Sequence, residues 1–96
     1  MNLDKAKKRI AKLVSRGFKG YPLVSIAYLG ATPALATKVV ISFVAEEGAE
    51  PQLQTFSAAT DVRHDENIQT VIVKIIERTD AQTVNESTHV APLTSA

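Results

Sequence analysis

Residues 21–29, with the sequence YPLVSIAYL, are apolar on both of the faces that a β-strand would have. Side chains alternate along a strand, so every second residue shares a face. One face carries Leu23, Ala27 and Leu29, and the other carries Val24, Ile26 and Tyr28. Apolar residues on both faces are typical of a strand inside a sheet rather than at its edge. The sequence therefore predicts an inner strand over these residues, with further strands and helices before and after it.

A second strand is predicted over residues 37–45. The residues at 30–33, Gly-Ala-Thr-Pro, separate it from the first strand as a turn or loop. Val39, Ile41 and Phe43 share one side of the segment, while Lys38 and Ser42 lie on the other. Alternation of β-branched or aromatic residues with polar ones indicates a strand with one face on the core.

A third strand is predicted near residues 52–57, after the polar loop at 46–51. Here Leu53 and Phe56 fall out of strict alternation. A β-bulge adds one residue to a strand and shifts the side chains that follow it. We therefore expect a bulge in this strand.

The segment before the inner strand has the pattern of an amphipathic helix over about residues 3–16. Its apolar residues recur at steps of three and four, at Leu3, Ala6, Ile10, Leu13 and Val14. Asn2 is placed to cap the N-terminus, and Asp4 lies in the first turn, where the helix dipole favours an acid. Gly17 can adopt the left-handed conformation that ends a helix.

The segment after residue 65 combines two conflicting signals. Residues 70–76 are rich in β-branched side chains, which strands prefer. The apolar residues nevertheless form a helical stripe, at Ile68, Val71, Ile72, Ile75 and Ile76. That stripe leaves Gln69, Lys74 and Glu77 outside, and Asp65 is placed as an N-cap. The sequence predicts a helix over residues 66–79 whose isoleucines face the sheet.

Residues 82–90 allow a short final strand, built around Val84 and Val90, and residues 92–96 are expected to form a flexible C-terminal tail. The predicted fold class is α+β. An N-terminal helix, a three-stranded antiparallel sheet and a second helix would form two layers in one domain over residues 1–91. A sheet this small leaves an edge open, which could pair with a second copy in a homodimer.

The composition is that of an ordinary globular domain, because 45% of the 96 residues are hydrophobic and 22% are charged. The chain has no cysteine, which favours a reducing compartment, so we expect a cytoplasmic protein. The apolar segments fall well short of the ~20 residues that a membrane span needs, and no apolar region of a secretory signal follows the start. We expect no membrane partner.

Charge is distributed unevenly along the chain. Residues 1–20 hold seven basic residues against Asp4, a net charge of +6, whereas the rest of the chain carries −5. The basic residues of the predicted N-terminal helix share the face opposite its apolar stripe. This face can bind nucleic acid by releasing counterions from phosphates, can bind an acidic protein, or can simply be solvated. The candidate binding residues are Lys5, Lys8, Arg9, Lys12, Arg16 and Lys19.

The candidates for catalysis are few. No serine lies in a Gly-x-Ser-x-Gly elbow, and no glycine-rich phosphate loop is present. The segment 61–66 places His64 among three carboxylates, but neighbours in sequence seldom converge on one metal ion or proton, and Asp65 is needed as a cap. The other histidine, His89, lies in a poorly patterned region. We therefore expect no metal and no cofactor.

Three functions remain open on the sequence. The first is a non-catalytic binding or protein-interaction module of unknown ligand, which could itself form a homo-oligomer. The second is a nucleic-acid-binding module that uses the basic N-terminal helix, with weak binding expected. The third is a small enzyme with a His–carboxylate site, which would require a concave pocket holding His64 or His89 beside a carboxylate.

Overall fold

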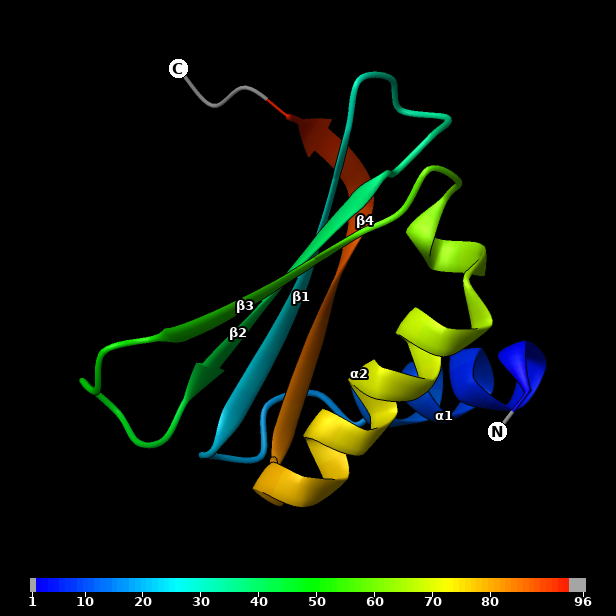
Figure 1. Ribbon diagram of the computed structural model, residues 1–96. Coiled ribbons are helices and arrows are strands. Elements are labelled where there is room, and N and C mark those ends of the chain that lie inside the picture. Colours follow the sequence, from blue (N-terminus) through cyan, green and yellow to red (C-terminus); the bar gives the residue numbers. More distant parts are fainter. Residues whose placement is uncertain (1, 94–96) are drawn as a thin grey trace.

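The computed structural model describes residues 2–93. In chain order its elements are α1 (Leu3–Ser15), β1 (Leu23–Gly30), β2 (Lys38–Val44), β3 (Gln52–Ser57), the 3₁₀ helix η1 (Val62–His64), α2 (Glu66–Thr79) and β4 (Thr83–Pro92). The two helices lie on the same side of the sheet (Figure 1). The predicted two-layer α+β fold is confirmed.

The sheet has four strands in the order β3-β2-β1-β4, so β1 is an inner strand as predicted. β1 pairs antiparallel with β2, and β2 pairs antiparallel with β3. β4 pairs parallel with β1, although more than fifty residues separate them in sequence (Figure 1). The three predicted strands pair antiparallel as expected, and the short final strand expected at residues 82–90 is present as β4. The predicted count of three strands is therefore one too low, and the sheet is mixed rather than entirely antiparallel. The physical reason is that α2 crosses back over the sheet and returns the chain beside the open edge of β1.

The bulge predicted in β3 is also wrong. β3 pairs with β2 in continuous register, with Leu53 opposite Ser42 and Phe56 opposite Val39. Leu53 and Phe56 break the alternation because they lie on opposite faces of the sheet. Phe56 packs against the core, while Leu53 is 65% exposed.

Both helices begin at the predicted caps. The Lys5 amide donates to Asn2 Oδ1 at 2.8 Å, and the Ile68 amide donates to Asp65 Oδ1 at 2.9 Å. Gly17, with a φ of 71°, follows α1 in the left-handed conformation. α2 is a helix over the predicted residues, so its amphipathic stripe outweighs the strand preference of its β-branched residues.

The core lies between the sheet and the two helices. It consists mainly of aliphatic side chains and includes Ile10 and Leu13 from α1, Val24, Ile26, Val39 and Ile41 from the sheet, and Ile72, Val73, Ile75 and Ile76 from α2. Gln69, predicted to lie outside, is instead 1% exposed. Its burial is tolerated because Nε2 donates to the Val62 carbonyl at 3.0 Å. The predicted C-terminal tail begins at Pro92, which ends β4, and residues 94–96 lie outside the described residues.

Gly30 ends β1 where the loop at 31–36 folds back over it. A Cβ at this position would overlap the Leu35 carbonyl oxygen and approach Ala36. Both are backbone groups, so they cannot move aside as a flexible side chain would. We expect Gly30→Ala to lower the free energy of unfolding by about 1–3 kcal/mol, measured by urea denaturation. Gly48→Ala is the steric control, because a Cβ there meets no atom and only its positive φ is strained. A loss at Gly30 no larger than at Gly48 would contradict the overlap.

Candidate functional site

A pocket of about 550 Å³ opens where α1, η1, β1 and β4 meet. Its lining consists of Lys7, Lys8 and Ala11 from α1, Tyr28 from β1, Arg63 and His64 from η1, Gln69 from α2, and Glu86, Ser87, Thr88 and His89 from β4. The volume is in the range of small-molecule sites. The pocket gathers both histidines of the chain and a carboxylate.

β4 is irregular at this pocket. Ile26 pairs with Glu86 and Tyr28 pairs with Val90, so β4 advances by four residues while β1 advances by two. In a regular strand successive side chains point to opposite faces, whereas the four residues Glu86–His89 all line the pocket. The Ser87 hydroxyl donates to the His89 carbonyl at 2.6 Å within this segment. Bulges re-aim side chains in this way and are frequent beside functional sites.

A buried tyrosine forms the floor of the pocket. Tyr28 is 3% exposed, and its hydroxyl donates to Glu86 Oε2 at 2.5 Å. Burial, together with this bond to the carboxylate, raises the pKa of the Tyr28 hydroxyl well above its ordinary value, and weaker effects of Gln69 and Arg63 act in the opposite direction. Tyr28 therefore stays protonated at neutral pH and holds Glu86 in place as a hydrogen-bond donor.

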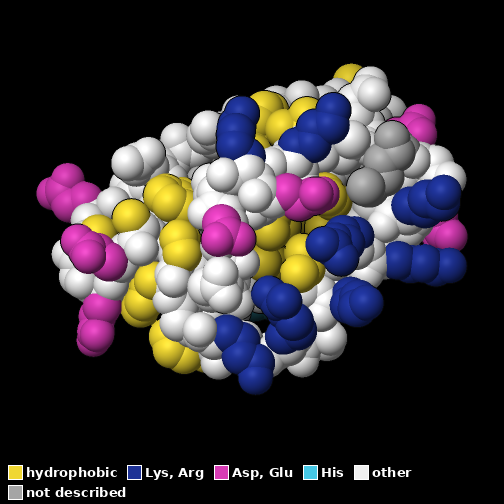
Figure 2. All heavy atoms as spheres, turned by 90° about the horizontal axis from the view of Figure 1, so that it is seen from below, with side chains coloured by type: hydrophobic (Ala, Val, Ile, Leu, Met, Phe, Trp, Pro, Cys, Tyr) yellow, Lys and Arg dark blue, Asp and Glu magenta, His cyan; other side chains and the backbone are white. Residues whose placement is uncertain are grey.

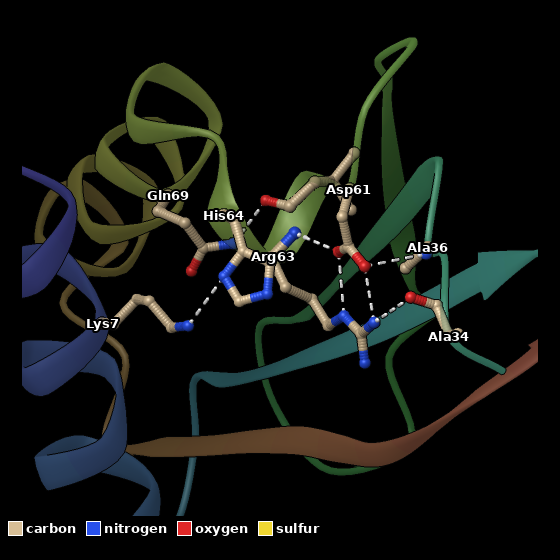
Figure 3. Close-up of polar contacts among 8 residues, drawn as sticks. Lys7, Ala34, Ala36, Asp61, Arg63, His64 and Gln69 are labelled. Carbon is tan, nitrogen blue, oxygen red and sulfur yellow. Dashed lines mark hydrogen bonds and ion pairs between the residues drawn. The ribbon is translucent and has the colours of Figure 1, made fainter.

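Arg63 is held at the pocket wall by Asp61 (Figure 3). Its Nε donates to Asp61 Oδ1 at 2.9 Å, and its Nη2 donates to Oδ2 at 2.5 Å. The same carboxylate accepts bonds from the backbone amides of Arg63 and Ala36. The Arg63 side chain, followed by these backbone bonds, holds the pKa of Asp61 well below its usual range. Asp61 is thus a structural residue that fixes the guanidinium.

Lys7 and His64 point toward each other from α1 and η1, and Lys7 Nζ lies 3.2 Å from His64 Nδ1 (Figure 3). A charged lysine can only donate a hydrogen bond, so His64 Nδ1 can take part in this contact only as the acceptor. Both residues are exposed, and fifty-seven positions separate them in the sequence.

The six predicted basic residues are all exposed, but the structure divides them. Lys8 lines the pocket and pairs with Asp4 at 3.1 Å, with both side chains largely exposed. Arg9 and Arg16 line a different hollow, together with Glu77 and Asp80. Figure 2 shows most of the Lys and Arg side chains in the centre and right of the view, with one group of acidic side chains at the left end and a few others among the basic ones.

The remaining members of the predicted set lie away from both hollows. Lys5 and Lys12 are exposed on α1, between its two flanks. Lys19 follows the helix, in a loop tied to the start of β4 by a 2.8 Å bond from its amide to the Thr83 hydroxyl. The predicted face is therefore an open surface whose two margins reach separate hollows.

Sequence reasoning missed the pocket residues on β1 and β4. Tyr28 was assigned by its apolar ring to a strand face, and nothing nearby in sequence points to its partner Glu86, fifty-eight positions away. Lys7 adds to the positive charge of residues 1–20 but is not among the predicted binding residues. The one available signal was the pair of histidines, but the sequence could not show that the two share a pocket.

The cluster at residues 61–66 forms no shared site. Asp61 caps η1 and Asp65 caps α2, and the cap at Asp65 is the predicted one. Within residues 2–93, no group of three or more His, Asp or Glu side chains is placed to hold a metal ion.

None of the helices in residues 2–93 is long and apolar enough to cross a membrane. Comparison with protein-family models, curated proteins and solved structures finds no match for the chain.

Proposed function

We propose that the protein is a non-catalytic binding module that takes a small anionic ligand in the pocket between α1, η1, β1 and β4. The observation that carries this proposal is the charge of the lining. The lining holds three cationic side chains, Lys7, Lys8 and Arg63, and one carboxylate, Glu86. Lys8 and Arg63 are also paired with Asp4 and Asp61, which are not among the lining residues, so Lys7 is the cation of the three without a carboxylate partner among the described residues. Two histidine rings add further hydrogen-bonding groups, and the excess charge of residues 1–20 attracts anions toward this side.

An acid–base enzyme is the second candidate, because His64 and His89 share the pocket with Glu86. A carboxylate that orients a catalytic histidine must bond to its ring. Glu86 instead bonds to Tyr28, and His64 Nδ1 contacts Lys7. These partners favour ligand binding over proton transfer.

Nucleic acid on the outer face of α1 remains the alternative in which a macromolecule is bound. It would use Lys5 and Lys12 as much as Lys7 and Lys8, because a duplex contacts an open cationic surface rather than a pocket.

A homodimer that pairs two sheet edges is compatible with either mode of binding. β3 and β4 are the two edges of the sheet, and β3 carries no charged residue.

Paired lysine substitutions separate the pocket from the outer face. We expect Lys7→Gln with Lys8→Gln to weaken binding of inorganic phosphate about fivefold or more, since a partly exposed ion pair contributes up to about 1 kcal/mol. Lys5→Gln with Lys12→Gln is the matched control and should change the affinity little. The measurement is a titration followed by NMR, in which the amide signals of residues 86–89 should shift.

The same two variants test the alternative with a DNA duplex. If the outer face binds nucleic acid, both pairs should weaken duplex binding alike, and the wild-type affinity should fall steeply with salt, with a slope of about −0.9 per phosphate neutralised. Phosphate binding that is absent, or that both pairs weaken equally, would contradict the pocket proposal.

A further inference from the structure

Two parts of the pocket lining differ in chemistry. α1 and η1 supply cationic side chains, Lys7, Lys8 and Arg63. The irregular segment of β4 supplies the carboxylate of Glu86, the hydroxyl-bearing residues Ser87 and Thr88, and His89. A ligand that satisfies both parts needs an anionic end and a neutral end that donates hydrogen bonds.

Arg63 is prepared to bind the anionic end. Its Nε and Nη2 atoms are engaged by Asp61, and Nη2 also lies 3.3 Å from the Ala34 carbonyl oxygen. Nη1 forms no hydrogen bond with the described residues and, in Figure 3, lies on the edge of the guanidinium away from Asp61. Because the carboxylate already fixes the guanidinium, a ligand would lose little side-chain entropy in using Nη1. Arginine and lysine donors together suit the oxygens of a phosphate group.

Glu86 is prepared to bind the neutral end. Its Oε2 accepts the Tyr28 hydroxyl, and within residues 2–93 its Oε1 accepts no hydrogen bond. Tyr28 is buried and packed in the core, so its hydroxyl holds the Glu86 carboxylate in place within the pocket lining. A phosphate placed against Glu86 would be repelled, whereas a ligand hydroxyl could donate to Oε1. The carboxylate therefore sets the direction in which a phosphorylated ligand enters.

We propose that the ligand is a small phosphate monoester that carries a free hydroxyl group. Its phosphate would lie against Lys7, Lys8 and Arg63 Nη1, and its hydroxyl would donate to Glu86 Oε1. This inference rests on the proposed function and narrows it to a chemical class. The pocket, at about 550 Å³, has room for a phosphorylated sugar of pentose size.

Calorimetric titration with ribose 5-phosphate, inorganic phosphate and ribose tests the proposal. Ribose 5-phosphate should bind about tenfold more tightly than inorganic phosphate, the ratio that one charge-assisted hydrogen bond supplies. Ribose alone should not bind measurably. Glu86→Gln should bring the affinity for ribose 5-phosphate to within about threefold of that for phosphate. Glu77→Gln, an equal charge change on α2 outside this pocket, is the matched control and should leave both affinities unchanged.

The outcomes separate this inference from the proposed function. If phosphate binds but ribose 5-phosphate binds no more tightly, the ester class is wrong and the anion pocket stands. The phosphate-monoester class is equally wrong if Glu86→Gln raises the affinity for both anions by the same factor, since Glu86 then acts only through its charge. Absence of binding for both anions would overturn the inference and the proposed function together. Circular dichroism of each variant would show that it is folded.

Discussion

Ile10→Ala is expected to lower the free energy of unfolding by about 2–4 kcal/mol. Ile10 is 1% exposed and lies in the core on α1, which packs against α2 and β4. Alanine would remove three buried carbon atoms and leave a cavity that the surrounding aliphatic side chains fill only in part. Denaturation by urea, followed by circular dichroism, measures the loss.

The opposite face of the same helix provides the control for Ile10. Lys5, Lys8 and Lys12 are exposed, so replacing all three with Gln should change stability little. Together the two variants compare the buried stripe of α1 with its solvated face. A loss below about 1 kcal/mol for Ile10→Ala would mean that the core adjusts around the smaller side chain, which a tightly packed helix should not allow.

Asp61→Ala is expected to cost about 2–4 kcal/mol, measured by the same urea denaturation. The Asp61 carboxylate accepts bonds from the Arg63 side chain and from the backbone amides of Arg63 and Ala36, so it joins η1 to the loop at 31–36. Its removal leaves a buried amide and a fixed guanidinium without their partner. Asp65→Ala is the matched control, because Asp65 caps α2 through one amide bond, and it should cost about 1 kcal/mol.

The dependence of stability on pH tests the Asp61 interaction independently. Arg63 lowers the pKa of Asp61 in the folded protein, so the unfolded chain takes up this proton first as pH falls. The stabilisation is complete above the ordinary aspartate pKa of about 3.9 and is lost as pH falls from there toward the lower folded value. Wild-type stability should therefore approach that of Asp61→Ala below about pH 4. A difference between the two proteins that stays constant down to pH 2 would show that the ion pair contributes nothing.

α1 and α2 could be predicted because their signals are local. Caps at Asn2 and Asp65 act on amides three residues away, and apolar spacing of three and four residues forms a stripe whatever the partner. β1 was predicted as an inner strand because both of its faces are apolar. Gln69 shows the limit of this reasoning, since a polar residue beside the stripe was expected in solvent and is buried against the Val62 carbonyl.

The sequence by itself determined the helices, the strand segments and the basic character of the first twenty residues, because each depends on residues that are near neighbours in the chain. Only the tertiary structure decided that β4 lies parallel to β1, because a strand with weak alternation takes the edge left open to it. It also decided the pocket, where Lys7, Tyr28, His64 and Glu86 meet from four elements. No local spacing encodes that meeting, because the side chains converge only once α2 has carried the chain back across the sheet and β4 has bulged beside Tyr28.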